Sequence, residues 1–195
     1  MGRIKSALEI ALERTEQVRG DKSSIGLFEA KQRGKRLANQ YLAGETDSLE
    51  AELKKAAGEE REALRSGCFD VLVTQITLPE REEELRRLEA VGKGLAAVTG
   101  DKRFPALYQR FMETAAQYME DAAQFDEGIK RQYAPKLRQK EEELARRLGQ
   151  AVRLDPFQDP EFVALYNQHK AMLKDHYAPL AGQIGEQARA LFQKA

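Results

Sequence analysis

The chain has 195 residues, of which 42% are hydrophobic, and its 32 basic and 32 acidic side chains leave no formal net charge. This length and apolar content are enough for one domain with a core of its own. The zero net charge argues against a protein that is drawn as a whole to nucleic acid or to an anionic membrane.

A single cysteine, Cys68, excludes a disulfide within the chain and is typical of a reducing compartment. The sequence has no run of about 18 apolar residues, which a membrane-spanning helix requires, and no apolar segment of a secretory signal. We therefore expect a cytoplasmic protein without a membrane partner.

The composition predicts an all-α fold. Charged residues make up 33% of the chain, residues that favour helices are abundant, and only six prolines interrupt them. We expect an elongated helical bundle of about five to seven helices with long antiparallel hairpins. It would comprise an N-terminal helical region, 1–100, and a C-terminal long-helix hairpin, 101–195, within one continuous domain.

The first helices are predicted over 3–18 and 24–42. The first has an amphipathic pattern and is expected to end at Gly20 and Asp21, while Gly44 caps the second. Its apolar face consists of Ile4, Leu8, Ala11, Leu12, Thr15 and Val18.

A third segment begins at about Asp47 and keeps the phase of a helix to Gln75, with Gly58 and Gly67 as candidate breaks. Its last part, "CFDVLVTQITL", is rich in β-branched residues. We predict helix there as well, because the chain has no second strand that could pair with it.

The next helix is expected to start at Thr77 and Pro79, with acidic residues in its first turns, and to end at Gly100. Apolar residues after it are spaced alternately four and three positions apart, which is the heptad seam of closely packed helices. This seam consists of Phe104, Tyr108, Phe111, Ala115, Tyr118, Ala122, Phe125 and Ile129.

The C-terminal region contains two pairs of similar segments. "DKRFPALY" at 101–108 resembles "DPEFVALY" at 159–166, and Tyr-Ala-Pro occurs at 133–135 and 177–179. We interpret them as an internal duplication of 101–152 and 159–195, with convergence of Ala-rich helices as the alternative. Asp159 is the expected N-cap of the last helix, which continues to about Phe192.

Pro135 and Pro179 are expected to disturb their helices. Proline inside a helix removes one backbone hydrogen bond and clashes with the preceding turn. We therefore predict a kink or a break near both positions. A kink is favoured, because no Gly or Asn adjoins Pro135 to form a turn.

His169 and His176 are the only histidines, and they lie two turns apart on one face. Metal-binding helices usually place their ligands three or four residues apart, so we expect no metal, no cofactor and no catalytic residue. Both histidines are candidate ligand or interface residues, as are Tyr108 of the seam and Tyr133, which follows the seam by four residues. Core packing is the favoured role of the seam itself.

The segment "KQRGKR" at 31–36 could contact phosphates of a nucleic acid. Its cations are Lys31, Arg33, Lys35 and Arg36. The cluster is short and has no aromatic residue on which bases could stack. A solvated face or a salt bridge to the acidic stretch at 45–66 is the favoured interpretation, and a nucleic acid partner is not expected.

No motif points to an enzyme. The hypothesis that fits best is a non-enzymatic structural or interaction protein that associates with itself or with another helical protein. One alternative is a ligand-binding or enzymatic bundle with a site near the aromatic seam and His169/His176. The other is a nucleic-acid-associated protein that uses the cluster at 31–36.

Overall fold

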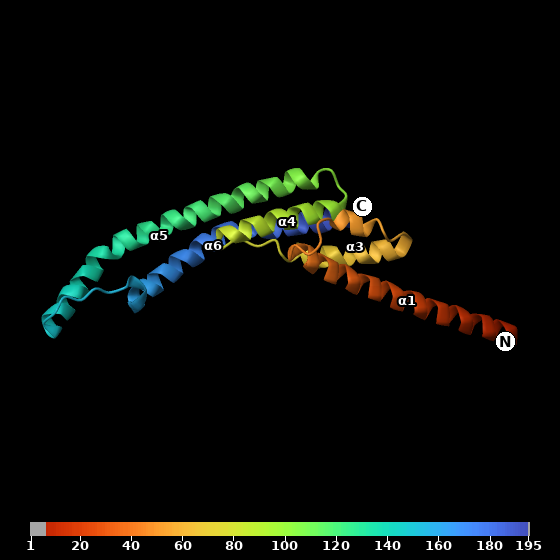
Figure 1. The fold of residues 1–195 in the computed structure, drawn as a ribbon, viewed down its shortest axis with the longest axis horizontal. Helices are drawn as coiled ribbons and strands as arrows, with labels where there is room; N and C mark the ends of the chain where they lie inside the picture. The colour runs from red at the N-terminus through yellow and green to blue at the C-terminus, as the bar shows by residue number, and fades with distance from the viewer. Residues whose placement is uncertain (1–6, 195) are drawn as a thin grey trace, which may run out of the picture. The chain divides into compact units, whose positions relative to one another are not determined.

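The computed structural model describes the backbone of residues 7–194 and the side chains of residues 24–194 (Figure 1). Within this range the chain forms six α-helices and one short 3-10 helix, and it contains no strand. The prediction of an all-α bundle is therefore confirmed. Ile4, where the first apolar face was expected to begin, lies outside the described residues.

The contacts group the chain into two compact units. One comprises residues 1–75, 90–105 and 187–195, and the other comprises residues 76–89 and 106–186. Each unit is described separately below. The division at residue 100 and the internal duplication stay predictions.

In the first unit, helix α1 (Ala7–Leu42) replaces the two helices that were predicted there. The expected end at Gly20 and Asp21 is wrong, since the helix continues through both residues. A glycine in a helix costs about 1 kcal/mol relative to alanine, which is too little to end a helix by itself. The expected end near Gly44 is correct, because this residue has a φ of 78°.

Helices α1 and α3 (Gly58–Val73) cross with their backbones in contact at Gly34 and Gly67. A Cβ atom on Gly34 would lie 2.0 Å from the carbonyl oxygen of Leu64, and one on Gly67 would lie 2.0 Å from that of Lys31. Only glycine fits at either position. Gly67 was a candidate helix break, but it is a crossing point instead.

The segment from about Asp47 to Gln75, which has the phase of a helix in the sequence, forms two helices. Ser48 caps the short helix α2 (Leu49–Leu53) by accepting a hydrogen bond from the Ala51 N–H. Gly58 then starts α3 with a φ of 56°, which favours glycine, so the break expected there is confirmed. Helix α3 ends at Val73, in the middle of "CFDVLVTQITL".

Helix α4 (Glu82–Thr99) begins later than predicted. Thr77 and Pro79 precede the helix, and Pro79 is fully buried, so this proline anchors a connection rather than a first turn. The expected end is correct, since Gly100 follows the helix with a φ of 66°. In the first unit, Arg65 of α3 donates to the last carbonyls of α4, 2.5 Å from the Val98 oxygen and 3.2 Å from the Thr99 oxygen.

The second unit is built around helices α5 (Phe104–Leu148) and α6 (Pro160–Phe192), which run antiparallel (Figure 1). A connection with the 3-10 helix η1 (Pro156–Gln158) joins them. The Asp159 side chain accepts from the Glu161 N–H at 3.1 Å, so the predicted cap of α6 is confirmed. Both helices continue through their prolines, so a break at Pro135 or Pro179 is wrong and a kink stays a prediction.

Candidate interaction surface

The heptad seam of α5 packs mostly against other parts of the protein. Phe104, Phe111 and Ala115 are fully buried, which confirms the expected core role of these positions. Farther along, aromatic rings of α5 meet rings of α6. Their centroids are 5.4 Å apart for Tyr118–Tyr177, 5.4 Å for Phe125–His169 and 5.2 Å for Tyr133–Phe162.

One seam residue, Phe125, remains partly outside this core. Its side chain is 39% exposed, and it lies in an open groove of about 530 Å³ that follows α5 and α6. His169 lines the groove, so the structure places one of the candidate residues there. The lining consists of Asp121, Gln124, Phe125, Gly128, Ile129, Gln132, His169 and Leu173.

A second groove of about 230 Å³ shares Phe125, Ile129 and Leu173 but is partly covered. Pro79 and Glu80, from the connection before α4, form part of its wall. The Glu80 carboxylate also forms an ion pair with Lys174 of α6, with an N–O distance of 3.4 Å. The connection before α4 thus covers one side of these apolar residues. On the other side, among the described residues, only α5 and α6 line the open groove.

Tyrosine hydroxyls of α6 donate to carboxylates of α5. Tyr177 donates to Asp121 at 2.5 Å, and Tyr166 donates to Asp126 at 3.2 Å. The bond with Asp121 is the main cause that raises the pKa of Tyr177, and it lowers the pKa of Asp121. These pairs cannot be found from the sequence, because their partners are 40 and 56 residues apart and only the register of the hairpin brings them together.

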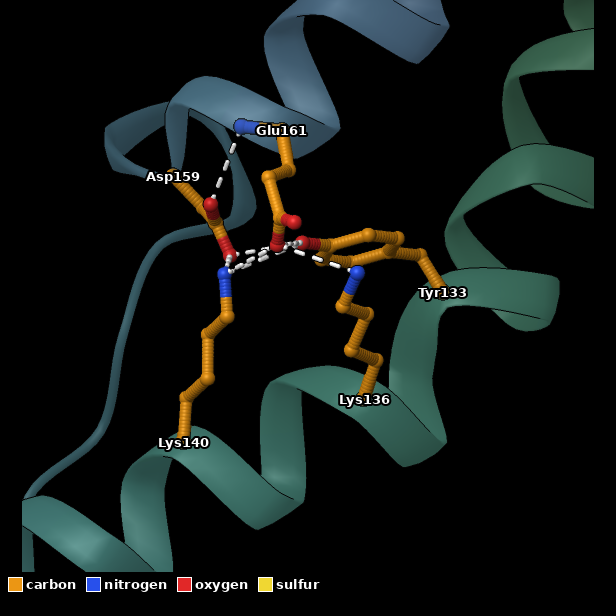
Figure 2. A network of polar contacts seen from close by, with 5 residues as sticks. All are labelled: Tyr133, Lys136, Lys140, Asp159 and Glu161. Carbon is orange, nitrogen blue, oxygen red and sulfur yellow. Dashed lines mark hydrogen bonds and ion pairs between the residues drawn. The ribbon is translucent and has the colours of Figure 1, made fainter.

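Tyr133 belongs to a network of polar contacts at the start of α6 (Figure 2). Its hydroxyl donates to Asp159 at 2.7 Å, and Lys140 donates to the same carboxylate oxygen at 2.7 Å. Lys140 and Lys136 also pair with Glu161, at 2.6 Å and 3.0 Å. The bonds from Lys140 and then Tyr133 lower the pKa of Asp159 to about 2.

This network holds α5 against α6. Asp159 Oδ2 and Glu161 Oε2 each accept from both Lys140 and Tyr133, and Asp159 Oδ1 accepts from the Glu161 N–H (Figure 2). In the described part of the chain, no buried side-chain nitrogen or oxygen lacks a hydrogen-bond partner. Tyr133 therefore has a structural role, and Lys140 and Asp159 are its partners that the sequence analysis did not identify.

The structure places the two remaining candidate residues, Tyr108 and His176, in different surroundings. Tyr108 is buried, and its hydroxyl donates to the Leu88 carbonyl oxygen at 2.9 Å, while burial raises its pKa. His176 is exposed on α6, with its ring 5.1 Å from that of Tyr177. Tyr108 thus contributes to the core, and His176 lies near Asp121, beside the open groove.

The basic cluster at 31–36 lies in the first unit. Arg33 pairs with Glu60, and Lys31 pairs with Asp70 at 2.9 Å. The first contact is the salt bridge to the acidic stretch that the sequence favoured. Arg33 and Arg36 line an open cavity of about 820 Å³, which Glu59 and Glu60 also line, so its charges are mixed.

Cys68 is buried, and its thiol donates to the Gly34 carbonyl oxygen at 3.2 Å. Burial raises the pKa of this thiol to about 12, so it is not a reactive thiolate near neutral pH. No group of three or more His, Cys, Asp or Glu side chains among the described residues could hold a metal ion.

None of the helices in residues 7–194 is both long enough and apolar enough to cross a membrane.

Residues 50–190 match the model of a protein family that is described as a family of unknown function (DUF6657). The match includes every residue that lines the open groove. Comparisons with curated proteins and with solved structures found no match.

Proposed function

The chain belongs to the family of unknown function DUF6657, and we propose that it is a non-enzymatic interaction protein that associates with a second copy of itself. The single observation that carries this proposal is the open apolar groove beside Phe125. The groove lies in the second unit, between elements whose register is fixed by the ring contacts and the Tyr–Asp hydrogen bonds.

The groove has the features of a helix-binding surface. Phe125, Ile129 and Leu173 form its apolar floor, and polar side chains from both helices form its edges. Met172, which is 61% exposed, extends the apolar surface along α6. Large apolar side chains that are grouped in this way, with a polar rim, mark interaction sites more often than scattered ones do.

A second hairpin fits this surface well. Two antiparallel helices that lie beside another such pair form a four-helix bundle, in which each helix covers the groove of the facing pair. A two-fold dimer uses the same surface on both copies, so one apolar groove is sufficient for the interface. Self-association therefore requires no feature beyond those already described.

Sedimentation velocity of the full chain at micromolar concentrations tests the proposal. We expect a dimer for the natural protein and a monomer for Phe125→Glu, because a carboxylate in the groove would be buried without a partner. Leu148→Glu is the matched control. It changes a 61%-exposed apolar residue of the same helix outside the groove, and it should leave the dimer intact.

Circular dichroism of both variants would establish that they remain folded. A natural protein that sediments as a monomer at every micromolar concentration would contradict the proposal. A dimer that Phe125→Glu leaves unchanged would place the contact elsewhere and would equally contradict it.

A further inference from the structure

Charged and titratable side chains are distributed unequally over the two edges of the open groove. The α5 edge carries Asp121 in the lining and Glu120 next to it, whose carboxylate accepts from Gln124 of the lining at 3.4 Å. The α6 edge carries His169 in the lining and His176 one heptad later. The acidic edge and the histidine edge thus belong to different helices of one hairpin.

This distribution distinguishes two ways in which identical hairpins could face each other. A two-fold axis across the helices would place α5 on α5 of the second copy, with acidic edges opposed. An axis along the helices would place α5 on α6 of the second copy, with acidic residues opposite histidines. Like charges that face each other across an interface are destabilising, so the second arrangement is favoured.

The heights of the residues along the hairpin agree with that arrangement. Phe125 lies level with His169, and Tyr118 lies level with Tyr177, as the ring contacts show. An axis along the helices preserves these heights. His176 of one copy would therefore lie level with Glu120 and Asp121 of the other copy.

We propose that the hairpins pair about a two-fold axis along α5 and α6, with His169 and His176 of each copy opposite the acidic edge of the other copy's α5. The pairing becomes tighter as the pH falls. This inference rests on the proposed self-association and adds to it the orientation of the partner and the groups that regulate the contact.

The surroundings of the histidines within one copy are consistent with such a role. His169 faces the Phe125 ring and the amides Gln124 and Gln132, and the carboxylate of Asp121 is in the same groove. Lys170 follows it on α6. His169 thus has one carboxylate of its own hairpin in the groove, while the partner would add another.

His176 is bordered by the Tyr177 ring and by Asp175 on its own helix, and it lies close enough to Asp121 of α5 to interact with that carboxylate. That carboxylate already accepts from Tyr177 and from Gln117. Histidine changes charge between pH 5 and 8, where carboxylates stay ionised. Protonation therefore adds attraction across the interface and shifts the equilibrium toward the dimer.

Sedimentation equilibrium at pH 8 and pH 6 tests the regulation. The Kd of the natural protein should fall by up to about fivefold for each exposed ion pair that forms. The double variant His169→Gln/His176→Gln should give a dimer whose Kd is the same at pH 8 and at pH 6. A natural protein with a Kd that is unchanged or rises at pH 6 would overturn the proposed pairing.

A charge exchange tests the orientation. His176→Glu and Glu120→Lys should each weaken self-association at pH 7, and an equimolar mixture of the two should form a heterodimer that is tighter than either homodimer. Absence of this recovery would overturn the orientation. If Phe125→Glu still abolished the dimer in that case, the proposed self-association would stand, whereas a natural monomer would refute both.

Discussion

At the scale of single residues, the best-determined positions are the glycines at the α1–α3 crossing. Gly34 and Gly67 each face a carbonyl group of the other helix at a distance that admits no Cβ atom. Cys68 lies at the same crossing, and its thiol donates to the Gly34 carbonyl oxygen. Small side chains let the two backbones touch, which fixes the position of one helix on the other.

Gly34→Ala is therefore expected to destabilise the protein. Its new methyl group would lie 2.0 Å from the Leu64 oxygen, so the helices must separate. We expect the free energy of unfolding to decrease by about 1–3 kcal/mol, the usual effect of overpacking, although alanine favours helices. Urea denaturation followed by circular dichroism measures the change.

Gly26→Ala is the matched control in the same helix, because nothing lies within 4 Å of its new Cβ atom. Its stability should increase by up to about 1 kcal/mol, as expected for alanine in place of glycine in a helix. Equal effects of the two substitutions would show that the backbones do not touch at Gly34.

At the level of the elements, the polar network joins α5 to α6 where their connection ends. It consists of Tyr133, Lys140 and Asp159, with Lys136 and Glu161 beside them (Figure 2). It lies directly before the two helices separate into the connection over 149–159. We infer that this network fixes the register of the hairpin at the end where the connection joins α5 to α6.

The polar network should contribute to the free energy of unfolding only at pH values at which Asp159 is ionised. Its pKa of about 2 lies below the ordinary value near 4, so the contribution is present above pH 4 and is lost as the pH falls toward 2. We expect Lys140→Met to raise the pKa of Asp159 and to reduce this loss. Carboxyl NMR titration measures the pKa, and denaturation between pH 4 and pH 2 measures the loss.

Lys136→Met serves as the control for that experiment, because Lys136 pairs with Glu161 and not with Asp159. It should leave the pKa of Asp159 below its ordinary range. If Lys140→Met also left this pKa unchanged, the ion pair between Lys140 and Asp159 would not exist in solution.

The two similar starts at 101–108 and 159–166 are locally alike. Asp101 accepts from the Arg103 N–H at 2.8 Å, and Asp159 accepts from the Glu161 N–H at 3.1 Å. Phe104 is fully buried, as is its counterpart at position 162. These likenesses are consistent with duplication. Convergence of two helix starts would give the same contacts, so the duplication stays a prediction.

At the scale of the whole molecule, the balanced charge bears on the nucleic acid alternative. The 32 basic and 32 acidic groups leave no net attraction, and two of the four cations at 31–36 are held in ion pairs. We expect the protein to elute from a heparin column at low salt. Retention to high salt would favour nucleic acid binding instead.

Glu60→Gln extends that measurement to one residue. It releases Arg33 from its partner and should increase retention on heparin, because one more cation becomes available. Glu59→Gln, next to it, removes the same charge without breaking this ion pair and is the control. Equal retention of the two variants would mean that only net charge matters.

Local sequence patterns were sufficient to predict the helical class, the buried face of α5 and most helix ends. These features depend on local spacing: the heptad seam, Gly58, Gly100 and the Asp159 cap are each read from a few neighbouring residues. Local rules failed at Gly20, which lies within α1, and at Pro79, which precedes α4. At Gly20 the cost of one glycine was overestimated, and at Pro79 burial outweighed the preference of proline for a first turn.

The contacts between residues far apart in the chain could not be predicted from such local patterns. A glycine such as Gly34 weakens an isolated helix, and only the contact with α3 shows why glycine is required there. The Tyr–Asp pairs and the groove beside Phe125 depend on the antiparallel register of α5 and α6. Spacing along one helix specifies which face is apolar, but the partner that covers this face, or leaves it open, is set by contacts between helices.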